Sequence, residues 1–227
     1  MRQIIKSGEP DEFITWKTSE DWAAGAPAWG EFTQAWRPAV VMRLVADQCG
    51  LCCYCCASIA KGDHHVEHFR PKGLPAYRAL TYEWQNLLAS CEGWPLPTNQ
   101  IPTVNTQRHC GAHKENWFTE GVTISPLTPG VEALFRYTGD GDIKPIKGIG
   151  AAEADAIEQT IVHLNMRSPS LVARRAQMLT DATGDGLKLT KAAWIDRYLA
   201  PDANGGLAEF WPALNYLYQR WHGDWWP

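Results

Sequence analysis

Cysteine is unevenly distributed in this chain of 227 residues. Five of its seven cysteines lie within residues 49–56, and the other two stand alone at positions 91 and 110. An odd and clustered set fits metal ligation better than a disulfide framework, because thiolates are strong zinc ligands. The sequence therefore predicts a metal site held by cysteine side chains.

Two pairs of cysteines can supply the four ligands that zinc prefers. Cys52 and Cys55 form a Cys-x-x-Cys turn, which lets one turn present two thiolates to one ion. Cys91 and Cys110 are the two cysteines outside the crowded segment, and we expect them to complete the set. We therefore predict a structural Zn²⁺ bound by these four residues.

The register within residues 49–56 stays open at this stage. Cys53 can pair with Cys55 or with Cys56 instead, and His109 can replace one thiolate. The alternative to zinc is that the thiols pack as small buried hydrophobic groups. Five cysteines in eight residues argue against that alternative.

Three histidines and a glutamate lie within residues 64–68. Neutral imidazole is a good general base near pH 7, because its pKa lies close to the working pH. We expect His68 to be such a base, with His64 and His65 as alternatives. Basic residues follow at once, and hydrolysis of a phosphodiester needs cations near the phosphate, a metal ion and an activated water.

Short strands and turns must position these residues. A strand is predicted at residues 66–69, ending at Pro71, and apolar residues at 81–90 lead into Cys91. Residues 91–110 are rich in Pro and Asn and indicate a loop. We expect a short helix that begins near Cys110 and includes residues 115–118.

Helices are predicted on both sides of this region. Phe32, Trp36, Val40 and Leu44 recur every fourth residue, and Pro38 either kinks that helix or begins a second one. A hairpin is expected around residues 139–143. The remaining helices are predicted at 154–164, 171–179, 190–199 and 207–221.

Charge and hydropathy narrow the function classes. The net charge of −4 predicts no general affinity for polyanions, although the segment from Lys61 to Arg78 is locally basic. The chain has no run of about 18 apolar residues, so we expect no membrane span. We expect a cytoplasmic protein, because no signal peptide is recognisable.

A wider pattern resembles a known family. The pattern is Cys-x-Tyr-Cys, then Glu-His-Phe-Arg-Pro-Lys at 67–72, Trp-x-Asn-Leu-Leu-x-Ser-Cys at 84–91 and His-Cys-Gly-x-x-Lys at 109–114. Its order and spacing resemble the HNH endonucleases, and among them the PtuB-type nucleases of Septu and related retron anti-phage systems. The resemblance covers roughly residues 52–118 and implies an α+β fold with a ββα-metal nuclease module.

The resemblance also implies roles for particular residues. His68 would deprotonate the attacking water, Glu67 would bind a catalytic Mg²⁺ or Mn²⁺, and Asn86 would brace the loop between the strands through backbone hydrogen bonds. The helix position that normally supplies a further ligand is Gly111 here, which has no side chain. We expect His113 to take that role, with His109 as the alternative. Phosphate contacts are expected from Arg70, Lys72 and Lys114.

Three regions follow from this reading. They are an N-terminal helical segment at 1–50, the nuclease module at 51–122 and a mainly helical region at 123–227.

The resemblance implies an ABC/SMC-like ATPase partner, and we expect the tryptophan-rich helices of residues 207–227 to dock on it. DNA is the favoured substrate, structured RNA such as tRNA is an alternative, and a non-catalytic zinc-binding interaction module is the rival from another class.

Overall fold

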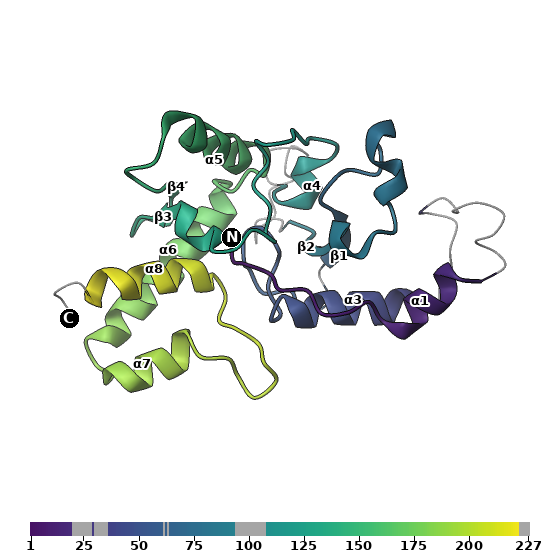
Figure 1. Cartoon of the computed structure of the whole chain (residues 1–227). Helices are drawn as coiled ribbons and strands as arrows, with labels where there is room; N and C mark the ends of the chain where they lie inside the picture. The colour runs from purple at the N-terminus through teal and green to yellow at the C-terminus, as the bar shows by residue number, and fades with distance from the viewer. Residues whose placement is uncertain (20–28, 30–35, 61, 63, 94–107, 223–227) are drawn as a thin grey trace, which may run out of the picture.

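The computed structural model describes residues 1–19, 29, 36–60, 62, 64–93 and 108–222, and it shows a mixed α and β chain (Figure 1). Its strands form two separate two-stranded antiparallel sheets. The first part of the chain contains α1 (Asp11–Lys17), α3 (Trp36–Asp47), β1 (His64–His68), two 3₁₀ helices (Pro75–Leu80 and Trp84–Asn86), β2 (Leu87–Cys91) and α4 (Gly111–Lys114). The second part contains a 3₁₀ helix (Val131–Leu134), β3 (Phe135–Tyr137), β4 (Ile143–Pro145), α5 (Ala151–His163), α6 (Pro169–Gly186), α7 (Lys191–Tyr198) and α8 (Trp211–His222).

The β1–β2 pair lies at the centre of the molecule, with α4 on one side and α3 on the other (Figure 1). Its register runs from His64 opposite Cys91 to His68 opposite Leu87. Every residue of β2 is buried. The side-chain amide of Gln48, just after α3, bonds the backbone of Ala89 in both directions, with distances of 2.7 and 2.8 Å. This side chain satisfies backbone groups that the partner strand does not reach.

Helix α3 confirms the expected apolar stripe. Trp36, Val40 and Leu44 are all buried on one face of the helix. Pro38 stands in the first turn of these bounds, where a missing N–H removes no intrahelical hydrogen bond. The first member of the expected stripe, Phe32, lies outside the described residues.

Helix α4 differs from the expectation at its end. It begins directly after Cys110, as predicted, but it ends at Lys114 and does not include residues 115–118. Glu115 adopts a left-handed backbone conformation with φ 49°. That conformation ends the helix, and a non-glycine residue gives no sequence signal for it.

The second half of the chain follows the predicted order. Tyr137 pairs with Ile143 in the β3–β4 hairpin, and the four C-terminal helices form where helical periodicity indicated them. Helix α8 begins at Trp211, four residues later than expected. Thr190 caps α7 by accepting a hydrogen bond from the Ala193 N–H (3.3 Å).

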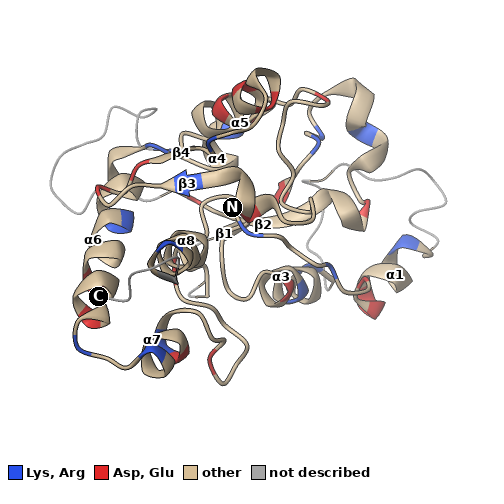
Figure 2. Ribbon diagram, turned by 60° about the vertical axis from the view of Figure 1, so that its left-hand side comes forward, with Lys and Arg blue, Asp and Glu red and all other residues tan. Residues whose placement is uncertain are grey.

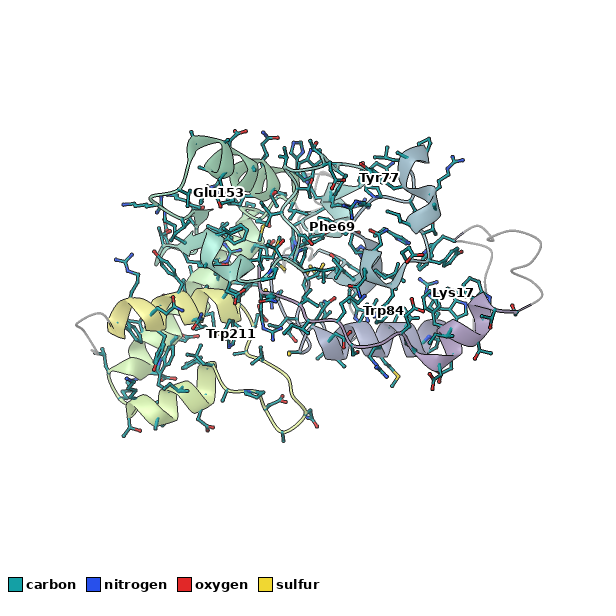
Figure 3. The ribbon with its side chains drawn as sticks, viewed as in Figure 1. Lys17, Phe69, Tyr77, Trp84, Glu153 and Trp211 are labelled. Atoms are coloured by element: carbon teal, nitrogen blue, oxygen red, sulfur yellow. The ribbon has the colours of Figure 1, made fainter. Side chains whose placement is uncertain are left out.

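One large hydrophobic core joins all three expected regions. It includes Phe13 and Val40, the cysteines of the central turn, and Ile157 and Phe210 from the second half. A smaller cluster around Trp194 binds α6, α7 and α8 together. Figure 3 shows Trp84 and Lys17 at the α1–α3 end and Trp211 at the opposite end, with Phe69 between them. The central sheet is therefore held from both sides.

Candidate metal centre and histidine–glutamate site

The four-cysteine cluster, which consists of Cys52, Cys55, Cys91 and Cys110, draws its thiols from three places in the fold. Cys52 and Cys55 lie in a tight turn closed by a hydrogen bond from the Cys52 N–H to the Ala57 carbonyl oxygen (2.8 Å). Cys91 ends β2, and Cys110 directly precedes α4. The four Sγ atoms all lie within 4.8 Å of one another, and all four residues are buried.

The spacing of these thiols fits a tetrahedral zinc ion. Sulfur atoms at about 2.3 Å from one zinc ion stand about 3.8 Å apart in a tetrahedron, and the Sγ atoms of Cys55 and Cys91 are 3.8 Å apart. Burial raises the pKa of Cys55 and Cys110 well above the ordinary value. At Cys52 burial acts in the same direction, but hydrogen bonds from neighbouring thiols outweigh it and lower the pKa well below that value.

Among these three thiols the protein alone therefore favours a single thiolate. A divalent cation supplies the positive charge that lets buried thiols ionise together. The four-cysteine cluster can thus hold a structural metal ion such as zinc. This set matches the predicted one, and within the described residues no other group of histidine, cysteine and carboxylate side chains converges as closely.

His109 borders the cluster without displacing a thiol. Its Nδ1 lies 3.2 Å from Cys110 Sγ and 3.6 Å from Cys91 Sγ. The ring is buried, and burial lowers its pKa to about 4. A neutral ring can donate an N–H to a thiolate, so His109 is placed to stabilise the charge on these sulfur atoms.

The remaining cysteines of the crowded segment lie outside the cluster. Cys53 and Cys56 are buried beside it, and Cys49 is half-buried. Burial raises the pKa of Cys56 to about 11 and that of Cys53 well above its ordinary value. These two groups therefore stay protonated at neutral pH.

Glu67 on β1 is the centre of a buried polar network. Its Oε1 accepts hydrogen bonds from the Tyr54 hydroxyl (3.0 Å) and from Lys114 Nζ (2.8 Å). Its Oε2 lies 3.7 Å from His65 Nε2. Burial raises the pKa of Glu67, but His65 and Lys114 outweigh burial and lower it below the ordinary value. Glu67 is therefore ionised at neutral pH.

Helix α4 approaches this carboxylate through Gly111. A Cβ atom at that position would lie 2.7 Å from both Glu67 Oε2 and His65 Nε2, closer than real Cβ atoms come. Glycine therefore lets both polar atoms lie directly against the backbone of α4. On its other side, His65 Nδ1 lies 3.4 Å from Glu92 Oε1. We call His65, Glu67 and Gly111 the histidine–glutamate site.

His68, the next residue of β1, makes different contacts. Its Nε2 lies 3.0 Å from the Thr81 carbonyl oxygen, which can only accept, so this nitrogen carries the proton. The Trp29 ring meets the His68 ring edge-on, with centroids 4.4 Å apart. Burial, together with the charge of Lys72, lowers the pKa of His68 to about 4. Nδ1 is buried and makes no hydrogen bond to any described residue.

Asn86 holds the segment that follows β1 through hydrogen bonds to the backbone of Arg70 and Leu80. Its Oδ1 accepts a hydrogen bond from the Arg70 N–H (2.7 Å), and its Nδ2 donates to the carbonyl oxygens of Arg70 and Leu80 (3.0 Å each). These are the backbone contacts that the resemblance implied for Asn86. A catalytic consequence for His68 stays a prediction.

The expected helix ligand, His113, points elsewhere. Its Nδ1 lies 3.0 Å from the carbonyl oxygen of His163 at the end of α5. The residues of α4 that meet Glu67 are Gly111 and Lys114 instead. The structure therefore brings neither His113 nor His109 to Glu67, since His109 lies against the cysteines.

The three expected phosphate contacts have different surroundings. The Lys114 side chain is fully buried and neutralises Glu67, so its Nζ has no surface to offer a phosphate. Arg70 is paired with Glu120 at 2.8 Å on the exposed surface. Lys72 is half-buried, with its Nζ 5.8 Å from the Trp29 ring centroid. In the view of Figure 2, the basic and acidic residues of the described chain are interspersed along the ribbon.

Sequence reasoning missed the network around Glu67. The sequence pattern places Tyr54 only in the Cys-x-Tyr-Cys turn, and for Lys114 the resemblance implies a phosphate contact. A signal for His65 was present, because residues two apart on a strand share a face and His65 therefore shares its face with Glu67. No sequence pattern indicates that Lys114 is buried, since that depends on how α4 packs.

No protein-family model and no curated protein matches this chain. Among the described residues, no helix combines the length and the apolar character needed to cross a bilayer. The function must therefore be argued from the site.

Proposed function

We propose that the chain is a metal-dependent endonuclease of the HNH type, which hydrolyses phosphodiester bonds in nucleic acid, with DNA favoured. The support is the order of the central elements, in which β1, β2 and α4 follow one another around the four-cysteine cluster. This order matches a ββα-metal module. Its β1 carries the carboxylate and the histidine that such chemistry needs, and the sequence pattern of residues 52–118 supports the same assignment.

The observation that carries the proposal is the state of His68. Thr81 fixes the tautomer so that the basic lone pair is on Nδ1, and this atom has no partner among the described residues. A pKa of about 4 keeps the ring neutral at pH 7 but makes Nδ1 a weak base while it is buried, so the pKa has to rise when water reaches Nδ1. A buried ring nitrogen without a hydrogen bond is unfavourable in a purely structural histidine.

In the proposed reaction Nδ1 of His68 takes a proton from a water molecule. The water oxygen forms a bond to phosphorus, the bond from phosphorus to the leaving oxygen breaks, and solvent protonates that oxygen. A bound Mg²⁺ or Mn²⁺ supplies positive charge to the phosphate and the leaving oxygen. Glu67 Oε2 is the carboxylate atom that can hold the ion. For water to reach Nδ1, the side chains that cover it, including Trp29, have to shift.

The burial of this site favours a second function. His68 is only 4% exposed and Glu67 already has a cationic partner in Lys114. Both facts suit a non-catalytic zinc-binding module that docks on another protein. The two functions differ in whether the purified chain cuts nucleic acid.

The decisive experiment is a cleavage assay with the full chain, alone and together with an ABC/SMC-like ATPase if the neighbouring genes encode one. Plasmid, phage DNA and total tRNA are each incubated with Mg²⁺ or Mn²⁺. We expect DNA cleavage by the wild type and a loss of about 10²–10⁴-fold in His68→Ala, the range for a general base. His64→Ala is the matched control, since His64 lies on the same strand with its Nδ1 3.1 Å from the Ile59 carbonyl oxygen.

Two results would change the assignment. Cleavage of tRNA alone would make the chain an RNA-cleaving nuclease. If the wild type with its partner leaves every substrate intact, the interaction module is the better reading. Zinc content and circular dichroism should be unchanged in both variants, so that lost activity is not lost folding.

The ATPase partner is part of the same proposal. Helix α8 packs Ala213 and Leu214 into the core, so deleting residues 207–227 would damage the fold. Docking is better tested by a variant that combines Arg220→Asp with truncation after His222. Arg220 is suitable because it is exposed on α8. We expect both changes together to abolish co-purification of the two proteins. Co-purification at the wild-type level would contradict docking through this end.

A further inference from the structure

His65 and Glu67 approach each other against the Gly111 backbone, and their facing atoms form a pair that one metal ion can share. We propose that His65 and Glu67 are the two protein ligands of a divalent transition-metal ion, bound through His65 Nε2 and Glu67 Oε2. This inference rests on the proposed function in one respect, because it assigns the ion that the nuclease chemistry uses. The binding itself can be measured without any substrate.

The distances suit one shared ion. Two ligand atoms at about 2.0–2.2 Å from the same ion stand about 3–4 Å apart, and His65 Nε2 lies 3.7 Å from Glu67 Oε2. Both atoms also lie 2.7 Å from the point where a Cβ of residue 111 would be. A side chain at position 111 would therefore collide with both atoms, and glycine lets them lie next to each other against the backbone of α4.

The two oxygens of Glu67 have separate partners. Oε1 receives the hydrogen bonds of Tyr54 and Lys114 inside the protein. Among the described residues, the neighbours found for Oε2 are His65 and Gly111. The carboxylate can thus bind an ion through Oε2 while its Oε1 stays neutralised by Lys114.

Glu92 supports the orientation of the ring. Its Oε1 lies 3.4 Å from His65 Nδ1, on the side away from Glu67. A carboxylate near one ring nitrogen favours a proton there and leaves the lone pair on the other, which is the arrangement found around histidine ligands. The side chain of His65 is 26% exposed, so an ion and its remaining water or phosphate ligands can reach the site.

The donor set indicates the class of ion. One imidazole nitrogen and one carboxylate oxygen favour a transition metal such as Mn²⁺ over Mg²⁺, which prefers oxygen ligands alone. Two protein ligands also leave several positions open, as a site that must bind phosphate oxygens requires. The expected preference is therefore Mn²⁺ over Mg²⁺.

The test uses Mn²⁺ alone with the zinc-loaded full chain. We expect one Mn²⁺ per chain, and pulsed electron paramagnetic resonance should detect one directly bound ¹⁴N nucleus. His65→Ala should abolish the nitrogen signal and weaken Mn²⁺ binding at least as much as the roughly 10–100-fold loss that follows removal of an outer partner. His64→Ala is the control and should keep both signals. Zinc content should stay the same in all samples.

A second variant tests the close contact of the two ligand atoms with α4. Gly111→Ala would place a Cβ atom 2.7 Å from both Glu67 Oε2 and His65 Nε2. We expect this Cβ to push the two ligand atoms apart and to weaken Mn²⁺ binding, with the zinc content unchanged. Wild-type Mn²⁺ affinity in Gly111→Ala would show that these two atoms do not hold the ion.

The outcomes separate the two proposals. Mn²⁺ binding without a coordinated nitrogen, or equal affinity in His65→Ala and the wild type, would overturn the role of His65. The nuclease would still stand if DNA were cut. Conversely, a nitrogen signal that depends on His65 in a protein that cuts nothing would support the metal site and count against the nuclease.

Discussion

The four-cysteine cluster and the histidine–glutamate site meet at the start of α4, and they differ in how their polar atoms are neutralised. The cluster gathers four thiols within 4.8 Å in a fully buried position. The other site has its polar atoms on His65 and Glu67, and the neighbouring Lys114 supplies a countercharge to Glu67. Cys110 and Gly111 are adjacent, so one short stretch of chain serves both.

We therefore expect the cluster to need a metal ion for folding and the histidine–glutamate site to fold without one. Buried thiols cannot ionise together without a cation, so we expect the binding of an ion by the cluster to be coupled to folding. Glu67 is ionised and paired before any ion arrives. We expect removal of zinc from the cluster to unfold the protein, whereas removal of a divalent ion from the histidine–glutamate site should leave it folded.

The largest effect should follow a break in the cluster. Cys110→Ser should lose about one zinc ion per chain and most of the folded population, because structural zinc contributes about 10–16 kcal/mol of apparent binding free energy. Zinc analysis and thermal unfolding measure both. Cys49→Ser is the control, since Cys49 lies outside the cluster and is half-buried. Retention of zinc and of the melting temperature in Cys110→Ser would show that the cluster is not the structural site.

The sequence predicts the cluster because residue type narrows the choice of ligands and the family resemblance fixes their register. Three pairs have the Cys-x-x-Cys spacing, at 49/52, 52/55 and 53/56, and the Cys-x-Tyr-Cys pattern of the resemblance selects Cys52 and Cys55. The β1–β2 pair and most helices also follow from periodicity and turn residues. In these parts local sequence and final structure agree.

The histidine–glutamate site was harder to predict because its parts come from tertiary packing. The left-handed Glu115 shortens α4, and this leaves Gly111 and Lys114 as the residues that face Glu67. Lys114 reads as a surface cation in any local pattern, and only the position of α4 explains its burial. The same packing sends His113 to His163, away from the carboxylate.

The next effect concerns the internal countercharge. Lys114→Met removes the cation that neutralises Glu67, and loss of one partner of a buried ion pair destabilises a protein by about 3–5 kcal/mol. Urea unfolding at pH 7 measures this change in the free energy of unfolding. Adding Glu67→Gln to Lys114→Met should recover most of the loss, because the unpaired charge is then gone. A loss below about 1 kcal/mol in the single variant would show that solvent or another group neutralises Glu67.

A smaller effect is expected from pH. The pKa of His68 is about 4 in the folded protein and about 6.5 when unfolded, so the folded state binds fewer protons between these values. Its contribution to stability is present above pH 6.5 and is lost as pH falls toward 4. Between pH 7.5 and pH 5 we expect a loss of about 2 kcal/mol from this group.

The wild type and His68→Leu should be compared by urea unfolding across that pH range. The difference between their slopes isolates His68, because zinc and the cysteines respond to pH in both proteins. The variant should lose less stability on acidification. Parallel slopes would mean that His68 can be protonated without cost in the folded state, and that its ring is more accessible than its buried position indicates.

The smallest stability effect should come from the surface pair of Arg70 and Glu120. Their side chains are 36% and 65% exposed, so breaking the pair should change the free energy of unfolding by less than about 1 kcal/mol.

DNA binding should respond differently. If Arg70 contacts a phosphate, Arg70→Gln should lower the salt dependence of binding by about one counterion. Glu120→Gln should instead strengthen binding, because it frees the guanidinium. Lys147→Gln, an exposed change between β4 and α5, is the control. An unchanged salt slope in Arg70→Gln would place the DNA elsewhere. Lys114 is fully buried, so half-buried Lys72 would then be the one remaining predicted phosphate contact beside His68.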